Sequence, residues 1–450
     1  MIAPEPFGPV VSPPVIDGGM GQAPEPGRRR RWWPALAGVL ALGLLVAVCA
    51  APVGRGIRAW TVGRGSPASA QPAPSPRPGD PPQVAQRWLA DQITTRLVAQ
   101  SAALLGGDQD GFLAPARAAA VRTALKSRYA ALRALRVAVW RPELVGLPVR
   151  TGGDNRWRTP VRFHHCFVTP DCRATSVLID LEWAEAATGP EIVTFGASPA
   201  TGQGPRPWED GELVAAAGKR TLVATIPAQR DRLPQLLAWA EAAAAVADRY
   251  VVTGPPPERY VVFLAGRAQW KRWYGGGLPP WTSGYAVPLP QGLFEVVLNP
   301  DQLTGGTMPE VLRHELAHVS SLPDGGYDDA GNWWLAEGLA DVAGADGRSV
   351  SGYPGLPDVQ GQFKAGWDGR FEVTEPDAKT PDWQVSARYG IAYLAVRHLN
   401  DRFGQRDLLT FFRRVVHERR SPDSVSLEVF GQPWERVRAD CAAYVRAAAD

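Results

Sequence analysis

Two histidines four residues apart, with a glutamate directly after the first, form the pattern in this sequence that is most typical of metal chemistry. His314 and His318 would lie one turn apart on one face of an α-helix, so that both imidazoles reach the same ion. Zinc accepts imidazole nitrogens at about 2.0–2.1 Å. Glu315 lies about 100° around the helix from His314, which places its carboxylate beside a metal-bound water rather than on the metal. The pattern predicts zinc-assisted hydrolysis with Glu315 as the catalytic base. The alternative is an exposed helix face that carries two solvated histidines.

A second acidic pair follows this pattern along the chain. Eighteen residues separate His318 from Glu337, and a Pro-Asp-Gly-Gly run at 323–326 breaks the chain between them. A second helix can then return antiparallel to the first, with Glu337 as the third, anionic ligand and a fourth position left for water. Asp341 lies one turn later, and we expect it to accept a hydrogen bond from the free ring nitrogen of His314. The alternative for both acids is a solvated pair on an amphipathic helix, which their apolar neighbours disfavour.

The elements that must position these residues are marked in the sequence. Thr307 with Glu310 three residues later predicts a capping box at the start of the histidine helix. Pro309 is tolerated in a first turn. A core-facing stripe recurs at helical spacing: Leu312, Leu316 and Val319. A strand predicted at 293–299 leads into this helix, so a strand–helix unit presents the site.

These residues resemble the gluzincin metallopeptidases, specifically the peptidase MA-like family, from about residue 259 to the C-terminus. The resemblance rests on His-Glu-x-x-His, on Trp-Leu-x-Glu-Gly-x-Ala-Asp at 334–341 and on a C-terminal helical pattern. That pattern comprises Tyr389-Gly390-Ile391-Ala392-Tyr393-Leu394, Phe403-Gly404 and Phe430-Gly431-Gln432-Pro433-Trp434. It implies a zincin-like peptidase domain with a helical C-terminal subdomain, a Zn²⁺ cofactor, and a peptide or protein substrate. The exopeptidase motif Gly-Ala-Met-Glu-Asn is absent, and Leu298-Asn299-Pro300 stands in its place, so aminopeptidase specificity is not predicted.

Hydrolysis of an amide also needs a donor for the oxyanion. The resemblance points to Tyr389, at the expected start of a helix where family members often carry a tyrosine; a core aromatic residue is the alternative. Tyr393 and His398 are the other candidates for this role. The strand at 294–299 is expected to pair with an extended peptide through backbone hydrogen bonds.

A separate α+β region is predicted at 84–228, before a peptidase domain at 229–450. Helical patterning comes first, and strand-like segments follow at 173–183, 191–195 and 221–226. Helices followed by a curled antiparallel sheet, with the phrase Leu-Leu-Gly-Gly-Asp at 104–108, resemble a nuclear-transport-factor-2-like domain. We therefore expect an accessory domain of that type.

A small cluster in this region has two interpretations. His164-His165-Cys166 with Cys172 would be a metal site, but adjacent strand residues point to opposite faces. A disulfide between Cys166 and Cys172 is the better use of these cysteines outside the cell.

The N-terminal segment predicts a membrane anchor. Residues 1–33 form a Pro- and Gly-rich cytoplasmic tail that ends in four arginines at 28–31 and two tryptophans. Residues 34–53 contain no charged residue, and about twenty such residues span a bilayer as one helix. The arginines before the span keep the N-terminus cytoplasmic. A Pro-rich linker at 54–83 holds the folded part outside the membrane.

Composition adds few constraints on function. The 450 residues carry a net charge of +3, too weak to imply a nucleic-acid partner, and the hydrophobic and charged fractions of 45% and 21% are those of a globular protein. The sequence as a whole predicts an α+β protein that acts as a membrane-anchored, extracytoplasmic zinc metallopeptidase. A zinc-stabilised scaffold without turnover, and hydrolysis of a non-peptide amide, are the competing hypotheses.

Overall fold

The computed structural model describes residues 75–449, apart from 152–154, 202–203, 304–305, 325 and 327–329. The predicted tail at 1–33 and the predicted span at 34–53 lie outside these described residues. Within the described part of the chain, no helix is both long and apolar enough to cross a bilayer. The first helix begins at Pro82, so the predicted linker ends two residues earlier than expected.

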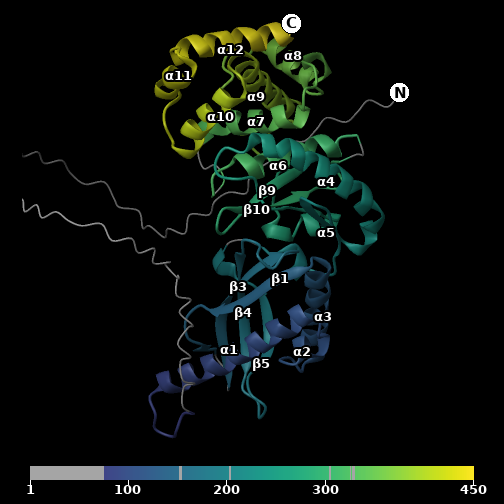
Figure 1. Cartoon of the computed structure of the whole chain (residues 1–450), viewed down its shortest axis with the longest axis vertical. Helices are drawn as coiled ribbons and strands as arrows, with labels where there is room; N and C mark the ends of the chain where they lie inside the picture. Colours follow the sequence, from purple (N-terminus) through teal and green to yellow (C-terminus); the bar gives the residue numbers. More distant parts are fainter. Residues whose placement is uncertain are drawn as a thin grey trace, which may run out of the picture. The chain divides into compact units, whose positions relative to one another are not determined.

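The first part of the described chain consists of helices followed by an antiparallel sheet (Figure 1). The helices are α1 (Pro82–Gly106), α2 (Gln109–Leu113) and α3 (Ala119–Ala134). The strands are β1 (Val137–Leu144), β2 (Val149–Arg150), β3 (Arg156–Phe167), β4 (Thr175–Ala184) and β5 (Glu191–Ala197). They are ordered β1-β3-β4-β5, with β2 paired to β3. The predicted order of elements is confirmed, and Gly107 ends α1 in the left-handed conformation that glycine adopts without strain.

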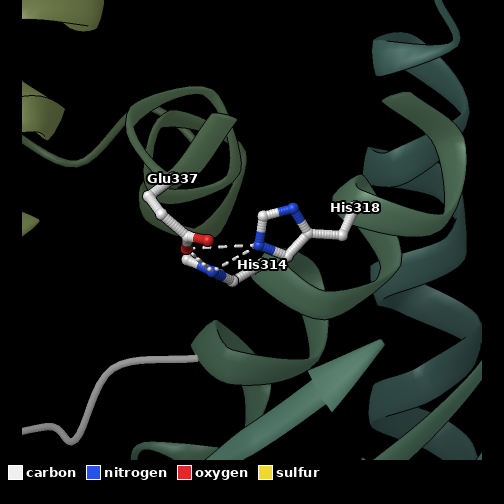
Figure 2. Close-up of side chains that lie close together, drawn as sticks. All are labelled: His314, His318 and Glu337. Atoms are coloured by element: carbon white, nitrogen blue, oxygen red, sulfur yellow. Dashed lines mark hydrogen bonds and ion pairs between the residues drawn. The ribbon is translucent and has the colours of Figure 1, made fainter. Parts of the chain in front are cut away.

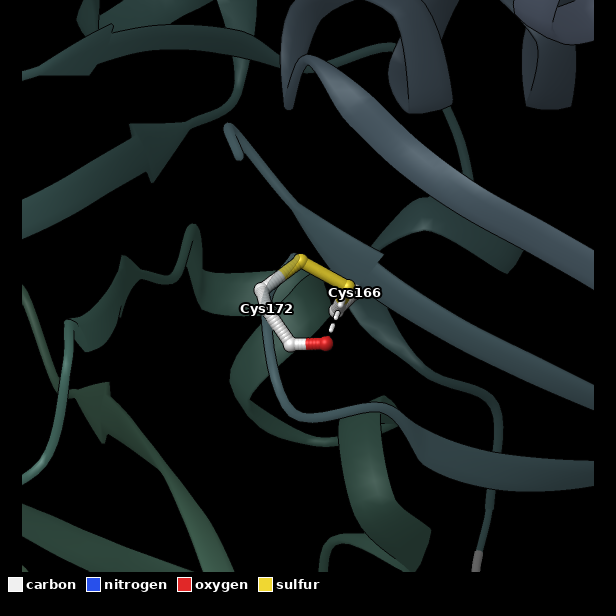
Figure 3. Close-up of a disulfide and its surroundings, with 2 residues drawn as sticks. All are labelled: Cys166 and Cys172. Atoms are coloured by element: carbon white, nitrogen blue, oxygen red, sulfur yellow. Dashed lines mark hydrogen bonds between the residues drawn. A yellow bond between two sulfur atoms is a disulfide. The ribbon is translucent and has the colours of Figure 1, made fainter. Parts of the chain in front are cut away.

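A disulfide joins Cys166 at the end of β3 to Cys172 in the turn before β4 (Figure 3). The prediction of this bond is confirmed, whereas the alternative metal site is not formed. His164 Nε2 lies 2.7 Å from Glu143 Oε2. His165 is buried and packs edge-on against Trp208, because neighbouring strand residues point to opposite faces.

Alkylation provides a direct test of this bond. In denatured but unreduced protein, an alkylating reagent should label Cys441, which is a free thiol, and leave Cys166 and Cys172 unlabelled. Reduction should then expose both. Labelling of Cys166 before reduction, detected by peptide mass spectrometry, would contradict the pairing.

A second sheet forms the platform for the site. Its strands are β6 (Val214–Ala217), β7 (Thr221–Thr225), β8 (Tyr260–Leu264), β9 (Gly284–Leu289) and β10 (Leu293–Leu298). Their order is β6-β7-β8-β10-β9, with β7, β8 and β10 parallel and the two outer strands antiparallel.

Two expectations about these strands are wrong. The strand predicted at 221–226 belongs to this second sheet, so the division between the sheets lies between β5 and β6 and not at residue 228. Parallel neighbours need a crossover, and α4 (Leu233–Ala247) provides it between β7 and β8. The strand predicted at 294–299 is β10, which is hydrogen-bonded on both sides, so it has no open edge for a peptide.

The remaining helices follow the second sheet, and several short turns connect the elements. The helices are α5 (Arg267–Trp270), α6 (Met308–Ser321), α7 (Trp333–Ala345), α8 (Leu356–Lys364), α9 (Asp382–Phe403), α10 (Gln405–Phe412), α11 (Pro422–Phe430) and α12 (Trp434–Ala449). The 3-10 turns are η1 (Pro199–Thr201), η2 (Pro207–Glu209), η3 (Pro227–Arg232), η4 (Asp248–Tyr250), η5 (Trp273–Gly275), η6 (Ala330–Asn332) and η7 (Val350–Gly352), and a π-helical turn, η8, covers Arg413–His417. The predicted helical C-terminal region is therefore present.

Both faces of the second sheet are buried. Val223 of β7 packs in one core with α4, α6, α7 and α9, whereas Leu222 and Ala224 pack in a second core with β3 and β4. Alternate residues of a strand point to opposite faces, so one strand contributes to both cores. The helix that carries the two histidines therefore rests on a rigid, doubly covered sheet.

Candidate metal centre

Helix α6 places both histidines in the interior of the protein. Leu312 and Leu316 are fully buried and Val319 is partly buried against the same core, which confirms the predicted stripe. The predicted capping box is wrong: the Thr307 side chain makes no capping hydrogen bond. The Glu310 carboxylate instead binds the Arg348 guanidinium, with Nη1 2.8 Å from Oε1, because a charge-assisted pair is a stronger partner than a backbone N–H.

Three ligand atoms meet between α6 and α7. Nε2 of His314 lies 3.0 Å from Nε2 of His318, and Oε2 of Glu337 lies 3.2 and 3.3 Å from these two nitrogens. Figure 2 shows the two imidazoles and the carboxylate turned toward one another, with the histidines on α6 and Glu337 on α7. All three side chains are buried. Among the described residues, this is the one group of three or more such side chains arranged to hold an ion.

The geometry of this triad fits zinc. Ligands at about 2.0–2.1 Å from a tetrahedral ion lie about 3.3–3.4 Å from each other, close to the spacing between these three atoms. Asp341 Oδ1 lies 2.7 Å from His314 Nδ1, which fixes the proton on that nitrogen in the neutral ring. The Nε2 lone pair of His314 then faces a second ring nitrogen and a carboxylate oxygen, and a cation is the partner that satisfies all three. The predicted positions of His314, His318, Glu337 and Asp341 are thus brought together.

The charges around the triad favour a cation. Burial alone would raise the pKa of Glu337, but the two histidines outweigh it and lower that pKa to about 2. Burial alone would lower the pKa of His314, yet hydrogen bonds and charge from Asp341 and Glu337 raise it well above its usual value. The Glu337 and Asp341 carboxylates thus favour positive charge at this point, and a divalent ion bound there would supply it.

Glu315 lies beside the triad but not in it. It is fully buried, and neither carboxylate oxygen has a hydrogen-bond partner among the described residues. Burial raises the pKa of Glu315 well above its ordinary value. The charge of His314 lowers that pKa by a smaller amount, and the repulsion of Glu337 adds to the rise. A buried carboxyl group without a partner is costly, and such groups concentrate where a water or substrate supplies the missing partner. This is the position required of a general base.

Gly284 at the start of β9 makes room for the Glu315 carboxylate, a contact that no sequence pattern indicated. A Cβ on Gly284 would lie 2.7 Å from Glu315 Oε1 and 3.0 Å from Leu298 Cδ2. The backbone of the strand therefore approaches the Glu315 carboxylate directly. In the described sheet β9 is the edge strand, paired to β10 alone.

Gly284→Ala should lower the rate of hydrolysis by about 10²-fold and leave zinc bound, because a displaced base loses its alignment while the ligands stay in place. Gly196→Ala is the matched control, since that strand glycine has nothing within 4 Å of a Cβ. Steady-state kinetics together with metal analysis measures both quantities. Equal rates for the two variants would show that Gly284 has no role at the site.

Tyr389 lies next to the triad, although it does not begin its helix as expected. Helix α9 begins at Asp382, two turns earlier. The ring centroid of Tyr389 lies 6.4 Å from that of His314 and 4.8 Å from that of Trp333, and the side chain is buried. Its position is compatible with a hydroxyl donor to a group bound at the site.

The two other candidates for this role have partners elsewhere. The Tyr393 hydroxyl accepts a hydrogen bond from Arg397 Nη1 at 2.8 Å. His398 stacks on Tyr444 of α12, with ring centroids 4.6 Å apart. Among the described residues, only Tyr389 of the three makes a ring contact with a member of the triad, so it is the one that the fold brings to the site.

Comparisons with known proteins give limited matches. No protein-family model matches the chain, and no curated protein matches it. Among solved structures, yeast leukotriene A4 hydrolase in complex with bestatin is 16% identical with a TM-score of 0.34, over 51% of this chain and 38% of that chain. The native yeast enzyme is 13% identical with a TM-score of 0.35, over 68% of this chain and 66% of that chain. A further native structure from Saccharomyces cerevisiae is 12% identical with a TM-score of 0.31, over 62% of each chain. The chain thus spans less than two thirds of the length of each of these structures. The geometry of the triad, rather than these similarities, supports the function proposed below.

Proposed function

We propose that this protein is a membrane-anchored, extracytoplasmic zinc metallopeptidase. The observation that carries the proposal is the buried triad of His314, His318 and Glu337, with the unpartnered carboxylate of Glu315 beside it. Three protein ligands leave one position open, which is the arrangement of catalytic rather than structural zinc sites. The resemblance to gluzincin peptidases indicates that the bond hydrolysed is a peptide bond.

The residues of the chain divide the work of hydrolysis. A bound zinc ion would polarise the scissile carbonyl and lower the pKa of the attacking water. Glu315 accepts the proton of that water and later delivers it to the leaving amine. Tyr389 donates its hydroxyl hydrogen to the oxyanion. Asp341 keeps the proton on Nδ1 of His314, so that Nε2 remains a ligand.

The substrate is an extended peptide that adds to β9. Among the described strands β9 pairs with β10 alone, and Gly284 at its start lies against Glu315. A peptide on this edge would run its backbone past the catalytic carboxylate and make strand-type hydrogen bonds. The strand at 294–299, which is paired on both sides, cannot take this role, and its neighbour β9 can.

The membrane part of the proposal rests on the uncharged run at 34–53 and the arginines at 28–31. The disulfide between Cys166 and Cys172 supports an oxidising compartment for the folded part. Added protease should digest the folded part in intact spheroplasts. Protection until the membrane is permeabilised would place it in the cytoplasm.

Tyr389→Phe should lower kcat by about 10²-fold with little change in zinc affinity, because one oxyanion donor is lost. Tyr444→Phe, which removes a hydroxyl from α12 away from the triad, is the matched control. If Tyr389→Phe behaves like that control in steady-state assays, Tyr389 is only a core aromatic residue.

The reaction itself is tested by analysing products. The full chain, reconstituted with zinc, should cleave a diverse peptide library and release new α-amines, which mass spectrometry locates in each sequence. Zinc-loaded protein that cleaves nothing would favour a scaffold. Cleavage confined to non-peptide amides would show that the protein is a hydrolase but not a peptidase.

A further inference from the structure

Asp341, the acid behind the first ligand histidine, uses both of its oxygens. Oδ1 lies 2.7 Å from Nδ1 of His314, and Oδ2 accepts a hydrogen bond from the Tyr353 hydroxyl at 3.1 Å. Tyr353 lies in the segment between α7 and α8, directly after η7. A carboxylate fixed at one oxygen can still turn about its Cβ–Cγ bond, whereas one fixed at both oxygens cannot. Tyr353 therefore restrains the acid that orients His314.

The Tyr353 ring is closely packed against its neighbours. One face stacks on Tyr393, with centroids 4.3 Å apart and planes 13° apart. Two glycines border the ring: a Cβ on Gly355 would lie 2.8 Å from Tyr353 Cε1, and a Cβ on Gly390 would lie 3.1 Å from the same atom. Close approach of this kind requires glycine at both positions. The hydroxyl is consequently delivered to Asp341 by a ring with little freedom to move.

The contacts behind the ring lead back to the histidine helix. Tyr393 accepts a hydrogen bond from Arg397, whose guanidinium also binds the backbone carbonyl of Arg348. Arg348 in turn binds Glu310 of α6, one turn before His314. A closed circuit of contacts thus links α6, α7 and α9 and the segment between α7 and α8. Such second partners orient metal ligands and set their basicity.

We propose that Tyr353 is a positioning residue for zinc: through Asp341 it holds His314 in the orientation and tautomer that bind the ion. It touches neither the ion nor the substrate. This inference rests on the proposed metal site, but not on the identity of the bond hydrolysed.

Zinc affinity of the full chain, measured by competition with a chromogenic chelator, tests the proposal without an activity assay. Tyr353→Phe should weaken zinc binding by about tenfold, at the lower end of the range for outer partners of metal ligands. Tyr444→Phe is the matched control, since its ring is likewise stacked, on His398 with centroids 4.6 Å apart, and it lies on α12, which carries none of the three ligands. The control should change zinc affinity by less than about twofold, because His398, the ring partner of Tyr444, is not one of the three ligands.

A double-mutant cycle separates positioning from general loosening. In an Asp341→Ala background, Tyr353→Phe should have almost no further effect on zinc affinity, because the hydroxyl has lost the group through which it acts. An equal loss in both backgrounds would overturn the proposal, as would a Tyr353→Phe variant that binds zinc like the wild type. Wild-type protein that binds zinc but cleaves no peptide would reject the proposed function and leave this inference standing. Wild-type protein without zinc affinity would reject both.

Discussion

Glu315→Gln should lower the rate of peptide hydrolysis by about 10²–10⁴-fold, the usual contribution of a general base, and leave one zinc ion bound. The amide cannot accept the proton of the attacking water, but it has nearly the shape of the carboxyl group. Glu315 has no hydrogen-bond partner among the described residues, so the substitution breaks no structural contact. The loss should therefore appear in kcat, whereas folding and metal content should be close to those of the wild type.

A matched substitution at another buried glutamate measures how much of the effect comes from changing a buried carboxyl group to an amide. Glu295→Gln makes the same change at another buried glutamate, whose partner is the Tyr274 hydroxyl. That variant should hydrolyse peptides at nearly the wild-type rate. If Glu315→Gln retains wild-type activity while metal analysis gives one zinc per chain, another group is the base.

Glu337→Gln should weaken zinc binding by about 10²–10³-fold. Binding energies of about 10–16 kcal/mol for four-ligand zinc sites correspond to roughly 3 kcal/mol per ligand, and each 1.4 kcal/mol is tenfold in affinity. The loss includes charge as well as geometry, because Glu337 is the anion that faces both histidines. Equilibrium dialysis against a zinc buffer measures the affinity, and hydrolysis at limiting zinc should fall in parallel.

Glu375 provides the control for charge alone. Partial burial and the repulsion of Glu337 raise the pKa of Glu375 to about 7, so above that pH it is a negative charge near the site that is not one of the three ligands. Glu375→Gln should keep zinc affinity within a few-fold of the wild type, in the range of a single partly screened charge. Equal losses from the two variants would mean that Glu337 acts through its charge and not as a ligand.

The grouping of the candidate metal ligands was predictable because local geometry determines their arrangement. A spacing of four residues on a helix places His314 and His318 on one face whatever surrounds them. Glu337 and Asp341 follow from the same rule applied to a second helix that returns antiparallel to the first. The pairing of Cys166 with Cys172 was also a local matter, since a turn closes six residues after the strand.

Which strands pair in a sheet depends on contacts between segments far apart in the sequence, and the predictions of strand pairing were less successful than those of the metal site. The strand at 221–226 follows the first set of strands along the chain, and this order alone predicts that it belongs to the first sheet. Its true neighbour is β8, reached through α4, and the strand–helix–strand order at 221–264 was the signal that could have revealed it. The edge position of β9 depends on which strand follows β8 in space, and nothing in the alternation of residues indicates that.

Two residues to which we assign a role at the site had no local signal in the sequence. Gly284 matters because a carboxylate from another element occupies the space of its missing side chain. Tyr353 is one tyrosine among Gly, Ser and Pro residues, and its role depends on contacts with α7 and α9. Neither spacing nor composition reports such contacts, because they arise only when the helices pack.

Cleavage of a peptide substrate, followed as zinc is added back to metal-free full-length protein, tests the central claim most directly. The rate should rise in proportion to bound zinc and reach its plateau at one ion per chain, because a single triad holds the ion next to a single base. Protein that takes up one zinc ion per chain through His314, His318 and Glu337 and still cleaves nothing would contradict the claim.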